Sequence, residues 1–227
     1  NLQNIPVRTA AGRRVREAFI AAPGHFIVSA DYSQIELRLL AHMSGDASFI
    51  DAFCQNQDIH ARTASEVFGV PLSEVSSDLR RKAKAVNFGI VYGISDYGLS
   101  RDLHIPKKEA GSYIESYFER YPGIKTYMEN IVREARDKGF VETMSHRRRK
   151  IPDINARNFN VRGFAERTAI NSPIQGSAAD ILKIAMINLD KALSARDFKS
   201  KLLLQVHDEI ILDVPLEELD EIKALVK

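Results

Sequence analysis

Strand-like segments stand near both ends of this chain, and a long helical pattern separates them. Residues 26–28 form a short apolar, partly β-branched run, and residues 202–206 and 210–214 form two more with a tight acidic turn between them. From about 49 to 138 apolar residues recur with helical spacing, interrupted by Gly and Pro. The economical prediction is one sheet-bearing unit with a large helical insertion, an α+β fold.

Local patterns predict where elements begin and end. The run at 26–28 reads as a buried strand, and 140–151 reads as a hairpin with a basic run at its turn. Ser33 and Glu36 have the spacing of a helix-capping box. A helix over 166–171 is expected to end at the Ser-Pro pair that follows, and a long helix is expected to begin at Ser177.

Composition excludes several classes of protein. With 44% hydrophobic and 27% charged residues, the 227-residue chain has the mix of a globular domain and can build a sizeable core. No apolar run approaches the ~18 residues of a membrane span. The lone cysteine, Cys54, excludes an internal disulfide framework and makes a cysteine-based zinc site a poor hypothesis. This cysteine usage suits a reducing, intracellular compartment.

Charge is nearly balanced overall but unevenly distributed. There are 32 Lys and Arg against 30 Asp and Glu, which gives a net charge of +2. Basic residues cluster at 13–16, 80–84 and 147–150. A single cluster is usually a solvated face, whereas three separate ones are consistent with a polyanionic partner.

Acidic residues stand at the ends of the predicted strands. Asp31 follows the first strand, and Asp208 and Glu209 lie between the last two. Carboxylates at neighbouring strand ends repel one another unless a cation lies between them, and an all-oxygen donor set favours Mg²⁺ or Mn²⁺. The alternatives are a turn residue after a strand and a hairpin tip that keeps an edge soluble. Asp-Glu is, however, a poor two-residue turn.

Residues 79–92 are predicted to form one amphipathic helix that presents two different rows. Its far side carries two cations and then two aromatic rings at four-residue spacing, namely Arg80, Lys84, Phe88 and Tyr92. Cations followed by flat rings suit a nucleoside triphosphate, since the cations face phosphates and the rings face base and sugar. An ordinary basic helix face with two extra core aromatics is the competing interpretation.

Three segments in this order resemble the motifs of the family A DNA polymerases. Residues 31–38, Asp-Tyr-Ser-Gln-Ile-Glu-Leu-Arg, resemble motif A, and residues 80–93, which begin Arg-Arg-Lys-Ala-Lys, resemble motif B. Residues 206–209, Val-His-Asp-Glu, resemble motif C, and Asn-Leu-Gln-Asn-Ile-Pro at 1–6 fits as well. Any one string is weak evidence, but three motifs in order over the whole chain are specific.

The resemblance implies a right-hand polymerase fold in which an antiparallel palm sheet carries a large helical fingers insertion. The palm would comprise residues 1–45 and 141–227, and the fingers 46–140. The family's thumb and any exonuclease domain would lie upstream, and a further helix and palm strand downstream. The chain is therefore expected to be a fragment of a larger, bacterial-type polymerase that acts in the cytoplasm, at the nucleoid, and not at a membrane.

The resemblance also implies roles for individual residues in adding deoxynucleoside triphosphates to a primer paired with template DNA. Asp31 and Asp208 would hold two Mg²⁺ ions, which Mn²⁺ would be able to replace, and Glu209 would be an auxiliary acid. Lys84 would neutralise the triphosphate and protonate the leaving pyrophosphate. Arg80 and His60 would also touch the phosphates, and Phe88 would pack on the sugar and base. Tyr92 would stack at the template side and move when the fingers close. The other expected nucleotide-binding residues are Glu36, as a steric gate under the sugar, and Gln34. The expected DNA-binding residues are Arg167, Asn171, Gln175, His207 and Arg8.

Three rival functions remain at this point. A single-subunit RNA polymerase shares the fold, but Glu36 and Phe88 argue against it. Loss of either metal-binding aspartate would favour a non-catalytic nucleic-acid-binding module. Asp31 and Asp208 are both present, which argues against it. A two-metal nuclease is disfavoured because the basic and aromatic helix face at 80–92 has no evident role in hydrolysis.

Overall fold

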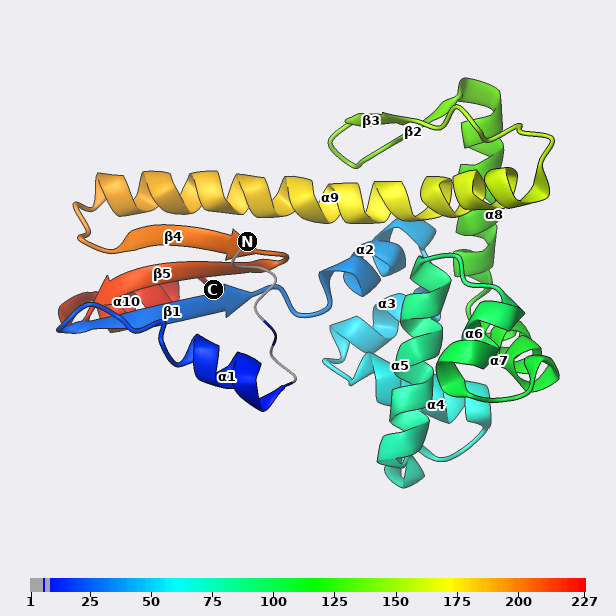
Figure 1. Cartoon of the computed structure of the whole chain (residues 1–227), viewed down its shortest axis with the longest axis horizontal. Helices are drawn as coiled ribbons and strands as arrows, with labels where there is room; N and C mark the ends of the chain where they lie inside the picture. The colour runs from blue at the N-terminus through cyan, green and yellow to red at the C-terminus, as the bar shows by residue number, and fades with distance from the viewer. Residues whose placement is uncertain (1–5, 7–8) are drawn as a thin grey trace. The chain divides into compact units, whose positions relative to one another are not determined.

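A computed structural model describes Pro6 and residues 9–227 of the chain. The chain divides into two compact units: unit 1 is Asn1–Ser33 with Ala179–Lys227, and unit 2 is Gln34–Ala178. In Figure 1 the strands and last helix of unit 1 are blue, orange and red, and the helices of unit 2 run from light blue to yellow-green. Arg8, an expected DNA contact, lies outside the described residues.

Unit 1 is built on a three-stranded antiparallel sheet in which β5 is central (Figure 1). Its strands are β1 (His25–Asp31), β4 (Lys201–Val206) and β5 (Glu209–Pro215), in the order β1-β5-β4. The helices are α1 (Ala10–Arg16), the short 3-10 helix η3 (Leu216–Glu218) and α10 (Leu219–Leu225). Alternate residues of β5 share one face, and Ile210, Leu212 and Val214 use it to pack against α10 and the C-terminal part of a long helix, α9 (Phe159–Ala195).

The sequence-based interpretation of unit 1 needs two corrections. The strand at 26–28 forms, but it lies at the edge of the sheet, and Phe26 and Ile27 are 45% and 41% exposed, so it is not buried. The hairpin turn is His207-Asp208, because Glu209 is already the first residue of β5. His207 takes the left-handed conformation that such a tight turn requires, with φ 56°.

Unit 2 is mainly helical, as the spacing of apolar residues at 49–138 predicts. Its helices up to the hairpin are α2 (Ile35–Ser44), α3 (Ala47–Cys54), α4 (Ile59–Phe68), η2 (Leu72–Glu74), α5 (Ser77–Val91), α6 (Asp96–Leu103), α7 (Lys107–Arg120) and α8 (Pro122–Lys138). The hairpin strands are β2 (Phe140–Glu142) and β3 (Arg148–Lys150). The basic run therefore lies mostly on β3, and not at the turn as expected.

α9 is one continuous helix, which corrects the expectation of a break at Ser172-Pro173. Proline removes a backbone donor and normally ends or kinks a helix. Here the residues before it are fixed by packing: Ala165, Ala169 and Ile170 join the core formed with α8 and the hairpin. The Ser172 hydroxyl donates to the carbonyl oxygen of Thr168 at 2.5 Å, so a side chain supplies a hydrogen bond to a backbone carbonyl in the turn before Pro173. Burial thus outweighs the local cost of Pro173.

The start of α2 also differs from the expected capping box. The N-cap residue is Gln34, not Ser33, and it has the left-handed conformation with φ 56° and no side-chain cap. The carboxylate of Glu36 accepts a hydrogen bond from a residue on another helix, described below.

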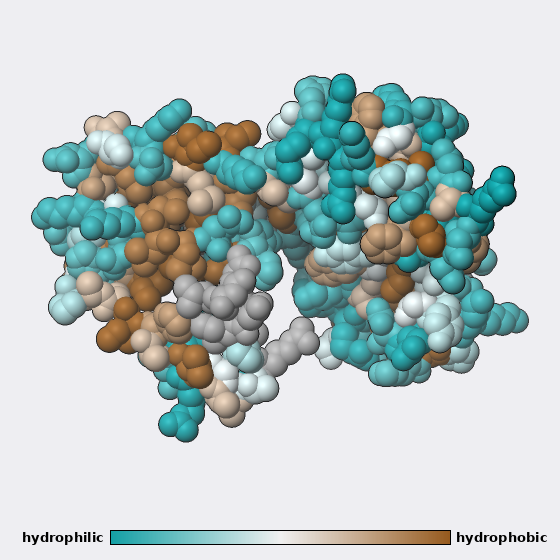
Figure 2. Space-filling model, turned by 45° about the horizontal axis from the view of Figure 1, so that its top comes forward, coloured by the Kyte–Doolittle hydropathy of each residue, from teal (hydrophilic) through white to brown (hydrophobic). Residues whose placement is uncertain are grey.

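Large apolar side chains are exposed on unit 1. Ile184 and Ile187 of α9 are 53% and 54% exposed, and Leu203 of β4 is 52% exposed. Figure 2 shows hydrophobic surface over this part of the chain, on the left of the view. Among the described residues, no helix is both long and apolar enough to cross a membrane.

Candidate functional site

The carboxylates predicted to bind metal meet at one end of the unit 1 sheet. Asp31 ends β1 and pairs across the strands with Glu209, the first residue of β5. Asp208 sits in the adjoining turn, and its carbonyl oxygen accepts a hydrogen bond from the backbone N–H of Tyr32 at 3.2 Å. The β-hairpin and the edge strand therefore bring together three acids that are separated by up to 178 positions in the sequence.

The pKa of Asp31 is raised by its surroundings in this cluster. Burial raises the pKa of Asp31, and the neighbouring charges of Asp208 and Glu209 raise it further, together with a hydrogen bond to the Asp208 side chain. The hydroxyl of Ser29, two residues before Asp31 on the same strand, donates to the carboxylate of Glu209. Ser29 was not singled out by the sequence, because a serine in a short apolar strand carries no specific signal.

The donor set fits a divalent cation that binds oxygen. In the part of the chain that the structure describes, no three or more His, Cys, Asp or Glu side chains surround a common metal position. Two close carboxylates with few other protein ligands match Mg²⁺, which keeps several waters or takes substrate oxygens in its shell. A cation bound between these carboxylates would offset their mutual repulsion.

In unit 2, α5 displays the two rows that the sequence predicts. Ala83, Val86 and Ile90 are buried in the core. On the other side Arg80 and Lys84 are exposed and Phe88 is half-buried. Lys84 Nζ lies 5.8 Å from the centre of the Phe88 ring, so the last cation and the first ring of the row are neighbours.

Arg80 is already paired in this structure. Its Nε and Nη2 atoms donate to Oδ2 of Asp58 at 2.8 and 2.7 Å, while Oδ1 of Asp58 caps α4 by accepting from the backbone N–H of His60 and Ala61. Burial works against the charge of Asp58, but the Arg80 and backbone hydrogen bonds outweigh it and lower the pKa of Asp58. Asp58 was not predicted, although an Asp just before a helix is the signal of an N-cap.

His60, an expected phosphate contact, is buried in the first turn of α4 and is only 3% exposed. Its ring lies 5.8 Å from that of Phe88, and its Nδ1 lies 3.1 Å from Nδ2 of Asn87. His60, Arg80, Lys84 and Phe88 are thus close together at the α4–α5 contact, while their role in binding a nucleotide stays a prediction.

Tyr92 connects the end of α5 with two other helices of unit 2. Its phenol donates to Oε2 of Glu36 on α2 at 3.1 Å, and it also hydrogen-bonds the side chain of Gln175 on α9. Burial raises the pKa of Tyr92, and the negative charge of Glu36 adds to that shift. The expected sugar gate and the expected template-side aromatic are therefore joined directly.

A cavity of about 250 Å³ collects the expected DNA-binding residues of α9 beside Tyr92. Its lining residues are Tyr92, Arg149, Phe164, Arg167, Thr168, Asn171, Ser172 and Gln175. Oδ1 of Asn171 is buried and lacks a hydrogen-bond partner among the described residues. Phe164 and Thr168 were not selected from the sequence. The sequence predicted a helix over 166–171 only, whereas α9 is continuous and places both residues on the same face as Gln175. Arg149 was considered only as part of a basic run.

Two further expected residues are not among those that line this cavity. Gln34 is the left-handed N-cap residue of α2, and His207 is exposed in the tight turn next to Asp208. Both adopt a backbone conformation that is uncommon for residues other than glycine. Their predicted contacts with nucleotide and primer are not tested by this geometry.

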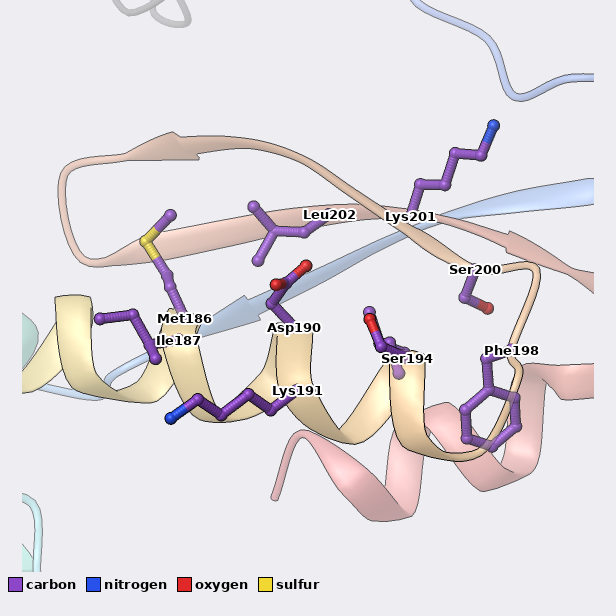
Figure 3. A pocket seen from close by; sticks show the side chains of 10 residues that line it. Met186, Ile187, Asp190, Lys191, Ser194, Phe198, Ser200, Lys201 and Leu202 are labelled. Carbon is purple, nitrogen blue, oxygen red and sulfur yellow. The ribbon is translucent and has the colours of Figure 1, made fainter.

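A larger hollow, of about 630 Å³, lies in unit 1 between α9 and the beginning of β4 (Figure 3). Met186, Ile187, Leu193, Phe198 and Leu202 supply most of its apolar lining. Figure 3 shows Asp190 projecting toward the strand that carries Leu202, and Lys201 pointing away from α9. None of the residues expected to act in chemistry lines it.

Comparison with known proteins gives one consistent answer. A family model described as DNA polymerase family A matches residues 1–227. The chain is similar to a DNA polymerase I of Lactococcus lactis subsp. lactis (strain IL1403), with 78% identity over 228 residues. It is also similar to one of Streptococcus pneumoniae serotype 4, with 64% identity over 229 residues. Both alignments cover all of this chain and 26% of the relative, so the chain spans about a quarter of their length.

A solved structure shares the fold. It is described as the POL domain of Pol1 from M. smegmatis in complex with a DNA primer-template and dNTP. The match has a TM-score of 0.95 and 48% identity, and it covers all of this chain and 40% of the other. The expected mixed fold, with an antiparallel sheet and a large helical part, is confirmed by this likeness.

Proposed function

This chain belongs to DNA polymerase family A, and from that premise we propose that it carries the chemistry and nucleotide selection of template-directed DNA synthesis. The reaction joins the primer 3′-hydroxyl to the α-phosphate of a deoxynucleoside triphosphate and releases pyrophosphate. The partners are primer-template DNA and deoxynucleoside triphosphates, met at the nucleoid in a bacterial cytoplasm. The observation that carries the proposal is the cross-strand pairing of Asp31 with Glu209 beside Asp208.

We assign the palm to residues 1–45 and 141–227 and the fingers to 46–140. The motif positions support this division, because motifs A and C flank the block that contains motif B. The two compact units divide the chain at other places, 33/34 and 178/179, and the second of these boundaries lies within α9.

Asp31 and Asp208 would hold two divalent cations, Mg²⁺ or Mn²⁺, with Glu209 as an auxiliary acid. When bound, the cations supply activation of the attacking hydroxyl and stabilisation of charge on the phosphate oxygens. The carboxylates themselves are kept in place by the ladder between β1 and β5 and by the Ser29 hydroxyl on Glu209. Positioned oxygen ligands need little reorganisation during the reaction.

Unit 2 would hold the incoming nucleotide. Arg80 and Lys84 neutralise the triphosphate, and Lys84 gives a proton to the leaving pyrophosphate. Phe88 packs on sugar and base, and Glu36, fixed by Tyr92, excludes a 2′-hydroxyl. The exposed row on α5 supports these roles, since it offers cations and rings to solvent on one side of a helix whose other side is core.

Tyr92, Arg167, Asn171 and Gln175 would contact the template-primer duplex, with His207 beside the primer end. The remaining roles are assigned by motif position alone: Gln34 toward the nucleotide and Arg8 toward phosphate. Contacts of this kind address groups that are similar for every base pair, so they hold DNA without reading its sequence.

The test compares Asp31→Asn and Asp208→Asn with the control Asp220→Asn, whose carboxylate is fully exposed on α10. Each is introduced into a protein in which this chain replaces the matching segment of the Lactococcus lactis relative. Primer extension with Mg²⁺ is expected to fall by at least about a thousandfold in the two site variants, with DNA affinity retained. Near-normal extension by either variant would overturn the metal-site assignment.

A further inference from the structure

Three polar side chains lie buried between α4 and α5 in unit 2. Thr63 and Asn87 are 0% exposed and His60 is 3% exposed. Asn87 stands on the inner side of α5, next to Phe88, and was not singled out by the sequence. A buried amide must form hydrogen bonds to offset the loss of water, so the partners of Asn87 determine what it does.

The hydrogen bonds of the Asn87 amide reach both neighbours. The Thr63 hydroxyl donates to Oδ1 of Asn87 at 3.2 Å and lies 3.1 Å from Nδ2, while Nδ2 also lies 3.1 Å from Nδ1 of His60. In this orientation Nδ2–H donates to Nδ1, which must then be the unprotonated nitrogen of the ring. A neutral imidazole in that arrangement carries its proton on Nε2.

The charges around His60 also favour the neutral ring. Burial lowers the pKa of His60 to about 4. The charged groups that act on it are Asp58, which raises the pKa, and Arg80 and Lys84, which lower it. An added proton on His60 would therefore meet two cations and only one carboxylate, which already pairs with Arg80.

We propose that Asn87 is a positioning residue that holds His60 as the neutral Nε2–H tautomer, so that His60 donates a directed hydrogen bond to a triphosphate oxygen. This inference rests on the proposed function, which alone assigns a triphosphate to this face of α5. A neutral donor adds a contact without a third positive charge between Arg80 and Lys84. Thr63 anchors the arrangement, because its hydroxyl contacts both polar atoms of the buried amide.

The first experiment reads the tautomer directly. The 227-residue chain is labelled with ¹⁵N at its histidines, of which it has six, and long-range proton–nitrogen spectra distinguish Nε2–H from Nδ1–H. We expect His60 to be Nε2–H in the wild type. Asn87→Asp replaces the donor with an acceptor, so Nδ1 is expected to gain the proton. An Nδ1–H tautomer in the wild type would overturn the proposal, whatever the chain's activity.

The second experiment measures deoxynucleoside triphosphate affinity against pH. Asn87→Asp is expected to weaken binding about tenfold at pH 8 and to make it depend on pH near the ordinary titration range of histidine. Asn130→Asp makes the same change of side chain at an exposed position on α8 and is expected to leave binding unchanged. Equal affinities for the two variants at every pH would contradict the proposal.

A double-mutant cycle separates positioning from simple damage. In a His60→Gln background the introduced side-chain amide can donate without help from residue 87, so Asn87→Asp is expected to cost little there. An equal loss in both backgrounds would show that Asn87 does not act through His60. Failure of the proposed function looks different: the wild-type chain would show the Nε2–H tautomer and yet have no affinity for the triphosphate.

Discussion

The phenol of Tyr92, at the end of α5, donates a hydrogen bond to Oε2 of Glu36, on the first turn of α2, at 3.1 Å. Fifty-six positions separate the two residues in the sequence. The contact holds the carboxylate that would exclude a ribose 2′-hydroxyl, and it ties that carboxylate to the aromatic residue expected to face the template. Selection against ribonucleotides and the expected movement of Tyr92 when the fingers close are therefore predicted to be linked.

Loss of this contact is expected to lower the selectivity for deoxyribonucleotides over ribonucleotides, less in Tyr92→Phe than in Glu36→Ala. Glu36→Ala removes the obstacle and should raise ribonucleotide incorporation most. Tyr92→Phe keeps the ring and removes one hydrogen bond of about 1 kcal/mol, so a rise of about fivefold is expected. Single-nucleotide insertion with ribo- and deoxyribonucleotides measures both, with Tyr97→Phe, exposed on α6, as the control. Unchanged selectivity in Tyr92→Phe would show that Glu36 holds its position alone.

Glu66 is expected to make stability depend on acid pH. Burial alone would raise the pKa of Glu66, but hydrogen bonds from Arg120, Tyr121 and Arg62 outweigh it and lower the pKa below the ordinary 4.5. The folded state thus prefers the charged form. The stabilisation is present above pH 4.5 and is lost as the pH falls through the lowered pKa.

Glu66→Gln is therefore expected to unfold more easily than the wild type by about 1–3 kcal/mol at pH 7, and the difference should narrow below pH 4.5. Urea unfolding at several pH values measures this. Glu129→Gln, at an exposed position on α8, provides the comparison and should show little effect at any pH. A difference that stays constant down to pH 3 would contradict the assignment.

The sequence predicted what depends on local spacing. The two rows of α5 follow from a repeat of 3.6 residues, and the helix is found as expected. The placement of Asp31 and Asp208 at strand ends also follows from pattern, since strand, acidic turn and strand are adjacent in the chain. Their juxtaposition with each other, however, requires the register of β1 against β5, which only the structure gives.

What the sequence could not predict depends on distant partners. Pro173 normally stops a helix, yet packing of Ala169 and Ile170 keeps α9 continuous. Asn87 was not singled out, because its partner His60 lies 27 positions away in the sequence. The exposed Phe26 looked buried because composition cannot tell an edge strand from a central one.

Gly93 is expected to be needed for the position of Arg167. It follows α5 with φ +66°, and an added Cβ would lie 2.9 Å from Cγ of Arg167. Gly93→Ala therefore carries a backbone cost of about 1 kcal/mol and also displaces a side chain that lines the Tyr92 cavity. Gly139→Ala is a matched control, since Gly139 has φ +76° but nothing within 4 Å of the added atom.

Both glycine variants are expected to lose similar stability in thermal unfolding, whereas only Gly93→Ala should weaken binding of primer-template DNA. The loss is expected to be several-fold and to shrink at high salt, because Arg167 would act on phosphate or nearby acceptors. Equal DNA affinities for the two variants would indicate that Arg167 adjusts without cost, or does not touch DNA.

Ser29 is expected to tune how the acidic site uses metal. Its hydroxyl donates to the carboxylate of Glu209, whose cross-strand neighbour is Asp31. Because the contact is exposed, Ser29→Ala should change the free energy of unfolding by no more than about 0.5 kcal/mol. Without this donor Glu209 is less fixed beside the two metal-binding aspartates. The Mg²⁺ concentration that gives half-maximal extension is therefore expected to rise, by up to about tenfold. Titration of extension rate with Mg²⁺ measures this, with Ser112→Ala on α7 as the exposed control. If the Mg²⁺ dependence of Ser29→Ala matches that of the control, Glu209 is positioned by the strand pairing alone.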